Sequence, residues 1–212
     1  MAIIHHLLNS TGRLDPYLQL IEEQLVSAIR SVSVHLSLEA DVCVSHNPGH
    51  TNSDLGIGGG AFSSNLMHIF LDADHIDIES TIRQEILPVF SHEAHHCKRI
   101  ETIPDDCSLV ASLVTEGLAC HFELDVAGGC KPSFIPEHVF TRADEYLVQM
   151  EPFLEDADFD YDTYFFGKTL GQYPKYAGFA AGFALVGRYL KSKSLSAAQA
   201  VAVPARQLRA CK

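Results

Sequence analysis

The sequence predicts an α+β fold in which a small sheet lies beside a mostly helical C-terminal half. About 47% of the 212 residues are hydrophobic and 20% are charged, which is the range of globular proteins. Strand-like segments and a glycine-rich hairpin are confined to the first third of the chain, and helical periodicity dominates from residue 76 onward. Such a separation of strands from helices is typical of α+β folds. We find no linker between independent domains, so we expect a single domain over residues 1–212.

The first third of the chain predicts one helix and a small sheet. Asp15-Pro16 opens the helix, because Asp caps helices well and Pro is favoured in their first turn. Apolar residues then recur every three or four positions, at Leu18, Ile21, Leu25, Ala28, Ile29 and Val32. Residues 41–46 and 67–71 read as strands. Residues 55–62 hold too many glycines for a strand interior and fit a hairpin, a bulge or an edge that another backbone approaches closely.

The remainder of the chain predicts helices. We expect them over residues 76–99, 109–124, 143–153 and 176–191. Pro88 kinks the first of these or starts a second helix. Patterning is weak after Ser192, so we expect residues 192–212 to form a frayed tail.

Composition excludes several classes of partner. The chain has 15 Lys+Arg against 27 Asp+Glu, a formal charge of -12, which argues against nucleic acid and against anionic membranes. No stretch reaches the roughly 18 apolar residues that a spanning helix needs, and the N-terminus has no cationic signal region. The six cysteines form no CxxC pair. We therefore expect a cytoplasmic protein with reduced cysteines.

The segment that carries chemistry is Ser91-His-Glu-Ala-His-His96, an HExxH pattern. On a helix His92 and His96 lie about 40° apart around the axis and one turn apart along it, so both imidazoles can bind one metal ion. Glu93, about 100° round the helix from His92, can reach a water beside that ion. This is the spacing of zinc proteases that use Glu as general base.

Two other interpretations of this segment remain open. His92 and His95 could share a metal at i, i+3, which would leave Glu93 without an obvious role. The segment could also be a histidine-rich surface helix that binds nothing. We prefer His92 and His96 as ligands, with His95 behind them.

A catalytic zinc needs a third protein ligand, and Glu116 is the best candidate. It lies on the next predicted helix, which would run back antiparallel after a short connection. A Glu on an apolar helix is costly to bury, which favours a bound cation as its partner. Glu123 and His121 are the alternative third ligands, and Arg99 or Lys98 could instead pair with Glu116.

Three segments resemble blocks of one family. SHEAHHCKR is similar to the HExHHxxR segment of the domain family described as predicted zinc-dependent proteases, of glutamate-zincin type. VTEGLACHF is similar to its EGLAxxF segment, and residues 174–183 to its GYxxGY segment. The blocks occur in the family's order. The resemblance implies a zincin-like fold, with a small mixed sheet and its edge strand packed on a metal-bearing helix. It also implies His92, His96 and Glu116 as ligands and Glu93 as the catalytic base, and its block includes Arg99, which we place behind the ligands.

The sequence departs from this family at two aromatic positions. Phe179 and Phe183 stand where the family usually has tyrosines. If one of those hydroxyls stabilises the oxyanion, the role is vacant here or is filled by Tyr173 or Tyr176. Such a donor is worth roughly 10²–10³ in rate.

The leading hypothesis is a zinc metallopeptidase with one zinc ion per chain that hydrolyses a peptide or protein substrate. The segment Gly58, Gly59, Gly60 and Ala61 would hold the substrate by backbone pairing, although an ordinary hairpin explains these glycines equally well. The alternative is a catalytically weak or inactive zinc-binding protein with a structural or binding role. Two histidines and one Glu also accept other divalent ions, and nothing in the sequence indicates an oligomeric state.

The acidic stretch 151–162 reads as a solvated loop. Asp alternates along it as in a calcium loop, but Tyr161 stands where such a loop needs Gly. We assign the stretch no metal.

Overall fold

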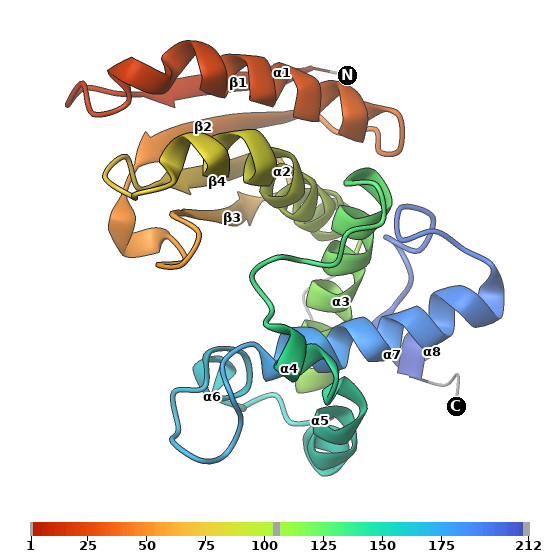
Figure 1. The fold of residues 1–212 in the computed structure, drawn as a ribbon. Coiled ribbons are helices and arrows are strands. Elements are labelled where there is room, and N and C mark those ends of the chain that lie inside the picture. The colour runs from red at the N-terminus through yellow and green to blue at the C-terminus, as the bar shows by residue number, and fades with distance from the viewer. Residues whose placement is uncertain (1, 104–106, 210–212) are drawn as a thin grey trace. The chain divides into compact units, whose positions relative to one another are not determined.

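A four-stranded mixed sheet lies in the N-terminal half of the computed structural model, which describes residues 2–103 and 107–209 (Figure 1). Its strands are β1 (Ile3–Leu8), β2 (Ala40–His46), β3 (Ile57–Ser63) and β4 (Leu66–Leu71). The strand order is β1-β2-β4-β3, in which β1, β2 and β4 run parallel and β3 runs antiparallel. The glycine-rich strand therefore forms one edge of the sheet.

The chain forms two compact units. The first comprises residues 1–101 and 126–129, and it holds the sheet with helices α1 (Leu18–Ser33) and α2 (Ile78–Thr102). The second comprises residues 102–125 and 130–212. Its helices are α3 (Leu109–Val126), α4 (Glu137–Phe140), α5 (Ala143–Met150), α6 (Tyr161–Phe166), α7 (Ala177–Lys193) and α8 (Ala205–Arg209). The α+β class and the mostly helical C-terminal half are confirmed.

In the first unit, α1 and α2 cover the same face of the sheet. The strand register places His5, Val42 and Met67 side by side on this face. The Nε2 atom of His5 lies 3.9 Å from Oε1 of Glu22, which α1 presents. Gly59, on the same face, touches α2. Between sheet and helices lies an apolar core of fully buried side chains, among them Ile21, Leu25, Val42, Val44, Met67, Ile69, Ile82, Ile86 and Phe90.

The other face of the sheet carries exposed apolar and polar side chains. Ile4 is 54% exposed. The His68 ring stacks on Phe70 with ring centroids 4.3 Å apart, and its Nε2 lies 2.9 Å from the Ser45 hydroxyl. Burial, and to a smaller extent the nearby His50, lower the pKa of His68.

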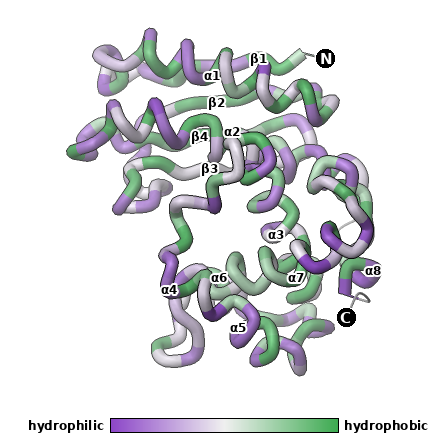
Figure 2. The backbone as a smooth tube through the Cα atoms, turned by 45° about the vertical axis from the view of Figure 1, so that its right-hand side comes forward, coloured by the Kyte–Doolittle hydropathy of each residue, from purple (hydrophilic) through white to green (hydrophobic). Residues whose placement is uncertain are grey.

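In the second unit, α7 packs against α4, α5, α6 and α8. Most of α7 is apolar or neutral (Figure 2), and ten of its residues are buried, including Ala177, Ala180 and Ala181 with no exposed surface. Small residues let neighbouring helices approach α7 closely.

Strand β1 is not predicted from the sequence. Its residues form the doublets Ile-Ile, His-His and Leu-Leu, so the polar and apolar alternation that marks a strand is hidden. Exposure nevertheless alternates along the strand, because β1 is an edge strand with one face towards α1. Along β1, whether a residue is apolar does not predict whether it is buried. The strand is therefore recognised only by its pairing with β2.

Two other expectations are revised. Helix α2 continues through Pro88, so this proline does not start a second helix. Residues 192–209, expected to fray, contain α8 and bury Ala197 and Leu208 completely. Cys211, within the expected frayed tail, lies outside the described residues. No helix within 2–103 or 107–209 has both the length and the hydropathy to cross a bilayer.

Candidate metal centre and active site

Helix α2 presents the predicted ligand pair in the middle of its length. Ile86 and Phe90 are fully buried one turn apart, and they fix the orientation of the helix just before His92. The His92 and His96 ring centroids are 4.7 Å apart, with the ring planes inclined by 77°. Two imidazoles therefore lie side by side on adjacent turns, as the i, i+4 spacing predicts.

Glu93 lies against the backbone of the edge strand β3. A Cβ atom added to Gly59 would lie 2.6 Å from Oε1 and 2.7 Å from Cγ of Glu93, and 2.8 Å from Cγ1 of Val89. Real Cβ atoms essentially never come within 3.0 Å of another heavy atom. Only glycine at position 59 lets the strand approach the Glu93 side chain, which is itself 7% exposed.

Close approach from the opposite face explains a second glycine of β3. A Cβ on Gly58 would lie 2.2 Å from the carbonyl oxygen of His50, which ends the short 3-10 helix η2 (Pro48–His50). A Cβ on Gly60 would only reach ordinary contact with the Phe62 ring, at 3.6 Å. Both the predicted hairpin and the predicted close approach of another backbone are confirmed, and a bulge follows Ala61.

The edge of β3 offers backbone groups for pairing. The Asn52 N–H donates to the Ile57 carbonyl on the side of β3 away from β4. Because successive residues of an antiparallel strand alternate in direction, Gly59 and Ala61 turn their N–H and C=O groups to that same side. Within the described ranges no other strand pairs with β3 there.

Other polar residues of α2 lie in the interior. His95 is fully buried and Arg99 is 4% exposed. The Cys97 thiol donates to the Leu66 carbonyl, and burial, helped by the charge of Glu93, raises its pKa to about 12. Lys98, an alternative partner of Glu116, forms an ion pair with Glu101 on its own helix at 2.7 Å.

In the second unit, α3 carries Glu116. The Tyr161 hydroxyl donates a hydrogen bond to its Oε1 at 2.9 Å. This contact bridges 45 positions of sequence and joins α3 to the start of α6. A carboxylate has two oxygens, and each can accept a hydrogen bond or bind a metal ion.

The residue after Glu116 fixes α3 against α7. A Cβ on Gly117 would lie 2.2 Å from the Gly182 carbonyl oxygen, and a Cβ on Gly182 would lie 2.2 Å from the Leu113 carbonyl oxygen. The two helices thus cross backbone to backbone at Gly117 and Gly182.

The two phenylalanines that replace tyrosines serve in packing. Phe183 stacks on His121 with ring centroids 3.9 Å apart, and the His121 Nε2 lies 2.9 Å from the Phe183 carbonyl oxygen. Phe179 contacts Phe134 and Phe165 edge to face, at 5.1 and 5.2 Å between centroids. His121, an alternative third ligand, therefore directs one ring nitrogen to α7, and burial lowers its pKa.

Tyr173 and Tyr176, the expected hydroxyl donors, precede α7. Tyr173 is 7% exposed and stacks on Tyr164 with centroids 5.0 Å apart, and burial raises its pKa. Tyr176 caps α7 with φ of +74°, a left-handed conformation that is rare for a residue with a side chain. Its N–H donates to the Phe165 carbonyl at 2.8 Å. Their role at the oxyanion stays a prediction.

His92, His96 and Glu116 are candidate metal ligands, and His92, Cys120 and Glu123 form a second candidate set. The first set is the one expected from the sequence. The second contains Glu123, an alternative third ligand.

Tyr161 is the residue that sequence reasoning does not select. The alternating aspartates around it draw attention to calcium chemistry. The signal that could have pointed to it is the aromatic series Phe159, Tyr161, Tyr164, Phe165 and Phe166, because frequent aromatic side chains indicate packing. Residues 151–158, apart from Leu154, are exposed, as the predicted solvated loop requires.

Comparison with known proteins places the chain in one family. The sequence model of one family, described as predicted Zn-dependent protease (DUF2268), matches residues 21–210. No curated protein and no solved structure matches the chain.

Proposed function

Because the chain belongs to the family of predicted Zn-dependent proteases, we propose that it is a zinc metallopeptidase with Glu93 as its general base. The observation that supports this most directly is the placement of Glu93, which follows His92 on α2 and lies against the open edge strand. The proposed base, the two proposed His ligands and the proposed substrate-binding strand all lie in the first unit.

The residues fit a zinc ion by their chemistry. Two imidazoles on adjacent turns of α2 and one carboxylate on α3 make a set of two His and one Glu, which is a ligand set of catalytic zinc. Three protein ligands leave one position open for water. We therefore propose that His92, His96 and Glu116 hold one zinc ion per chain.

Glu93 would perform the proton transfers. A bound zinc ion supplies a Lewis acid that lowers the pKa of a water molecule to about 7. The Glu93 carboxylate accepts a proton from the water that attacks the peptide carbonyl, and it then donates this proton to the departing amine. The Glu93 carboxylate lies against Gly59, beside β3.

The substrate would bind as an additional strand on β3. Gly59 and Ala61 offer their N–H and C=O groups on the edge away from β4, where an extended peptide can pair with them. Gly58 and Gly60 shape the same segment without side chains of their own. Backbone pairing favours extended peptides over other amides, which supports peptide or protein substrates.

Glu93→Gln tests the assignment of the base. The amide keeps the shape of the side chain but cannot accept the proton, so we expect cleavage of a quenched peptide library to fall by about 10²–10⁴-fold. Zinc content should equal that of the wild type. Glu101→Gln, an exposed change on the same helix, is the matched control. Wild-type turnover by Glu93→Gln would show that Glu93 is not the base.

The alternative is a zinc-binding protein with little or no catalysis. It is favoured by Phe179 and Phe183, which pack against other aromatic rings and carry no hydroxyl group. It is also favoured by the second candidate set, since Cys120 or Glu123 would close the coordination of zinc. Intact zinc binding without cleavage of any library peptide would support this function.

We further propose that residues 1–212 act as one zincin-like domain in the cytoplasm. The family match runs through both units, which supports a single evolutionary domain. Cys43, Cys97, Cys107 and Cys130 are free thiols, which is consistent with a reducing compartment.

A further inference from the structure

We propose that Tyr161 is a positioning residue of the metal centre, whose phenol holds the Glu116 carboxylate in the orientation that binds zinc. The inference rests on the proposed function, because it needs Glu116 to be a ligand. It goes further, because it gives a role to a residue outside the three blocks that define the site.

The chemistry of the contact suits this role. The Tyr161 hydroxyl donates to Oε1 of Glu116 at 2.9 Å, a distance typical of a hydrogen bond. A carboxylate has two oxygens, so one can accept from the phenol while the other binds the metal. Groups that hydrogen-bond a ligand orient it and raise its metal affinity, and their loss typically costs about 10–100-fold.

The Tyr161 ring is held by aromatic packing. It stacks on Phe165, one turn later in α6, with ring centroids 4.2 Å apart and planes inclined by 9°. Phe165 in turn packs on the bare backbone of Gly178, where a Cβ would lie 2.7 Å from its ring. The phenol therefore cannot turn away from Glu116 without disturbing α6 and α7.

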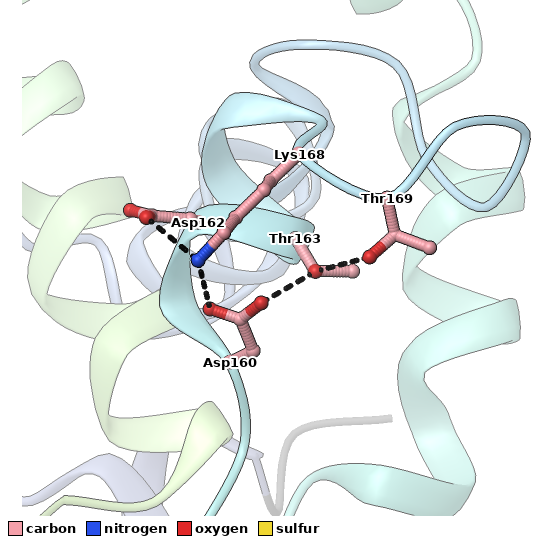
Figure 3. A network of polar contacts seen from close by, with 5 residues as sticks. All are labelled: Asp160, Asp162, Thr163, Lys168 and Thr169. Carbon is pink, nitrogen blue, oxygen red and sulfur yellow. Dashed lines mark hydrogen bonds and ion pairs between the residues drawn. The ribbon is translucent and has the colours of Figure 1, made fainter.

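A polar network fixes the start of α6, where Tyr161 lies (Figure 3). Asp160 accepts a hydrogen bond from the Thr163 hydroxyl at 2.8 Å, and this hydroxyl lies 2.8 Å from that of Thr169. The Lys168 ammonium bridges Asp160 at 3.8 Å and Asp162 at 3.4 Å. These contacts hold Asp160 and Asp162, the residues on both sides of Tyr161. The end of the acidic stretch therefore helps to fix the start of α6.

Helix α7 supports both members of the pair. Gly182 sets the distance to α3 at Gly117, next to Glu116. Gly178, one turn earlier, contacts the Phe165 ring, on which the Tyr161 ring stacks. One face of α7 thus determines where both the carboxylate and the phenol lie, which gives the third family block a structural purpose.

Zinc titration of full-length apoprotein tests the proposal. Tyr161→Phe keeps the ring and its stacking on Phe165 but removes the hydroxyl. We expect its zinc dissociation constant, measured against a competing chelator, to rise about 10–100-fold. The urea midpoint for unfolding of the Tyr161→Phe apoprotein should equal that of the control Tyr164→Phe. This control changes the same helix and should bind zinc like the wild type.

A double-mutant cycle separates positioning from a general effect. If Tyr161 acts through Glu116, then Tyr161→Phe should have no further effect on zinc affinity in a Glu116→Gln background. Equal losses in both backgrounds would overturn the proposal, as would wild-type zinc affinity in Tyr161→Phe alone. Failure of the wild-type protein to bind zinc would instead overturn the proposed function itself, so the two failures are distinguishable.

Discussion

Replacing Gly59 by Ala should disturb the general base while leaving the metal ligands in place. The added Cβ would lie 2.6 Å from Oε1 and 2.7 Å from Cγ of Glu93, whereas ordinary contacts begin at 3.4 Å. Either Glu93 or the strand must move by most of an ångström. A displacement of about 1 Å at a reacting group can cost 10²-fold in rate, so we expect kcat/KM to fall by about that factor with unchanged zinc affinity.

Stability provides a readout of the same contact that does not depend on a substrate. Overpacking of this kind costs about 1–3 kcal/mol, because Val89 also blocks the new methyl group at 2.8 Å. Gly60→Ala is the matched control for stability, since its Cβ meets only the Phe62 ring at 3.6 Å. Gly49→Ala, whose Cβ comes no nearer than 3.5 Å to a neighbour, is the control for activity.

The assay is urea unfolding of the three variants beside the wild type, followed by zinc titration and peptide cleavage. We expect Gly59→Ala alone to unfold at lower urea, and we expect it to lose activity relative to Gly49→Ala. Equal unfolding midpoints and equal cleavage rates for Gly59→Ala and Gly49→Ala would refute the claim that β3 restrains Glu93.

Three further predictions concern helix packing and titration. Gly117→Ala should unfold the chain at markedly lower urea, because its Cβ would lie 2.2 Å from the Gly182 carbonyl and neither backbone can yield cheaply. Cys97 should resist alkylation at pH 8 in the folded protein, where its pKa of about 12 keeps the thiol protonated, while the exposed cysteines react in peptide mass spectra. The His68 ring should titrate below the ordinary pKa of 6.5 in NMR spectra, and His50→Gln should move its pKa part of the way back, because burial is the larger cause. Since folding lowers this pKa, His68 contributes stability above pH 6.5 that is lost as the pH falls towards the folded pKa.

Local patterns predicted the parts of the fold that depend on neighbouring residues. The four-residue spacing of His92 and His96 requires only one helix, and the side-by-side rings follow from its geometry. The helix over 109–124 and the glycine-rich hairpin likewise depend on composition within a single segment. These features were predicted because no distant contact is needed to form them.

Contacts between segments that are distant in the sequence could not be predicted from local patterns. The hydrogen bond from Tyr161 to Glu116 links positions 45 residues apart, and no periodicity marks it. The close approach of Gly117 to Gly182 likewise emerges only from the fold. The first strand was missed for a related reason, since its doublets acquire their alternation only through pairing with β2.

The most direct test of the account is the zinc content of untagged full-length protein purified without added metal, measured by elemental mass spectrometry beside a His92→Ala/His96→Ala variant. We expect about one zinc per wild-type chain and almost none in the variant, because both imidazoles are proposed as ligands. Absence of zinc from the wild type, with none taken up on titration, or equal zinc in both proteins, would contradict the assignment of α2 as the metal-binding helix.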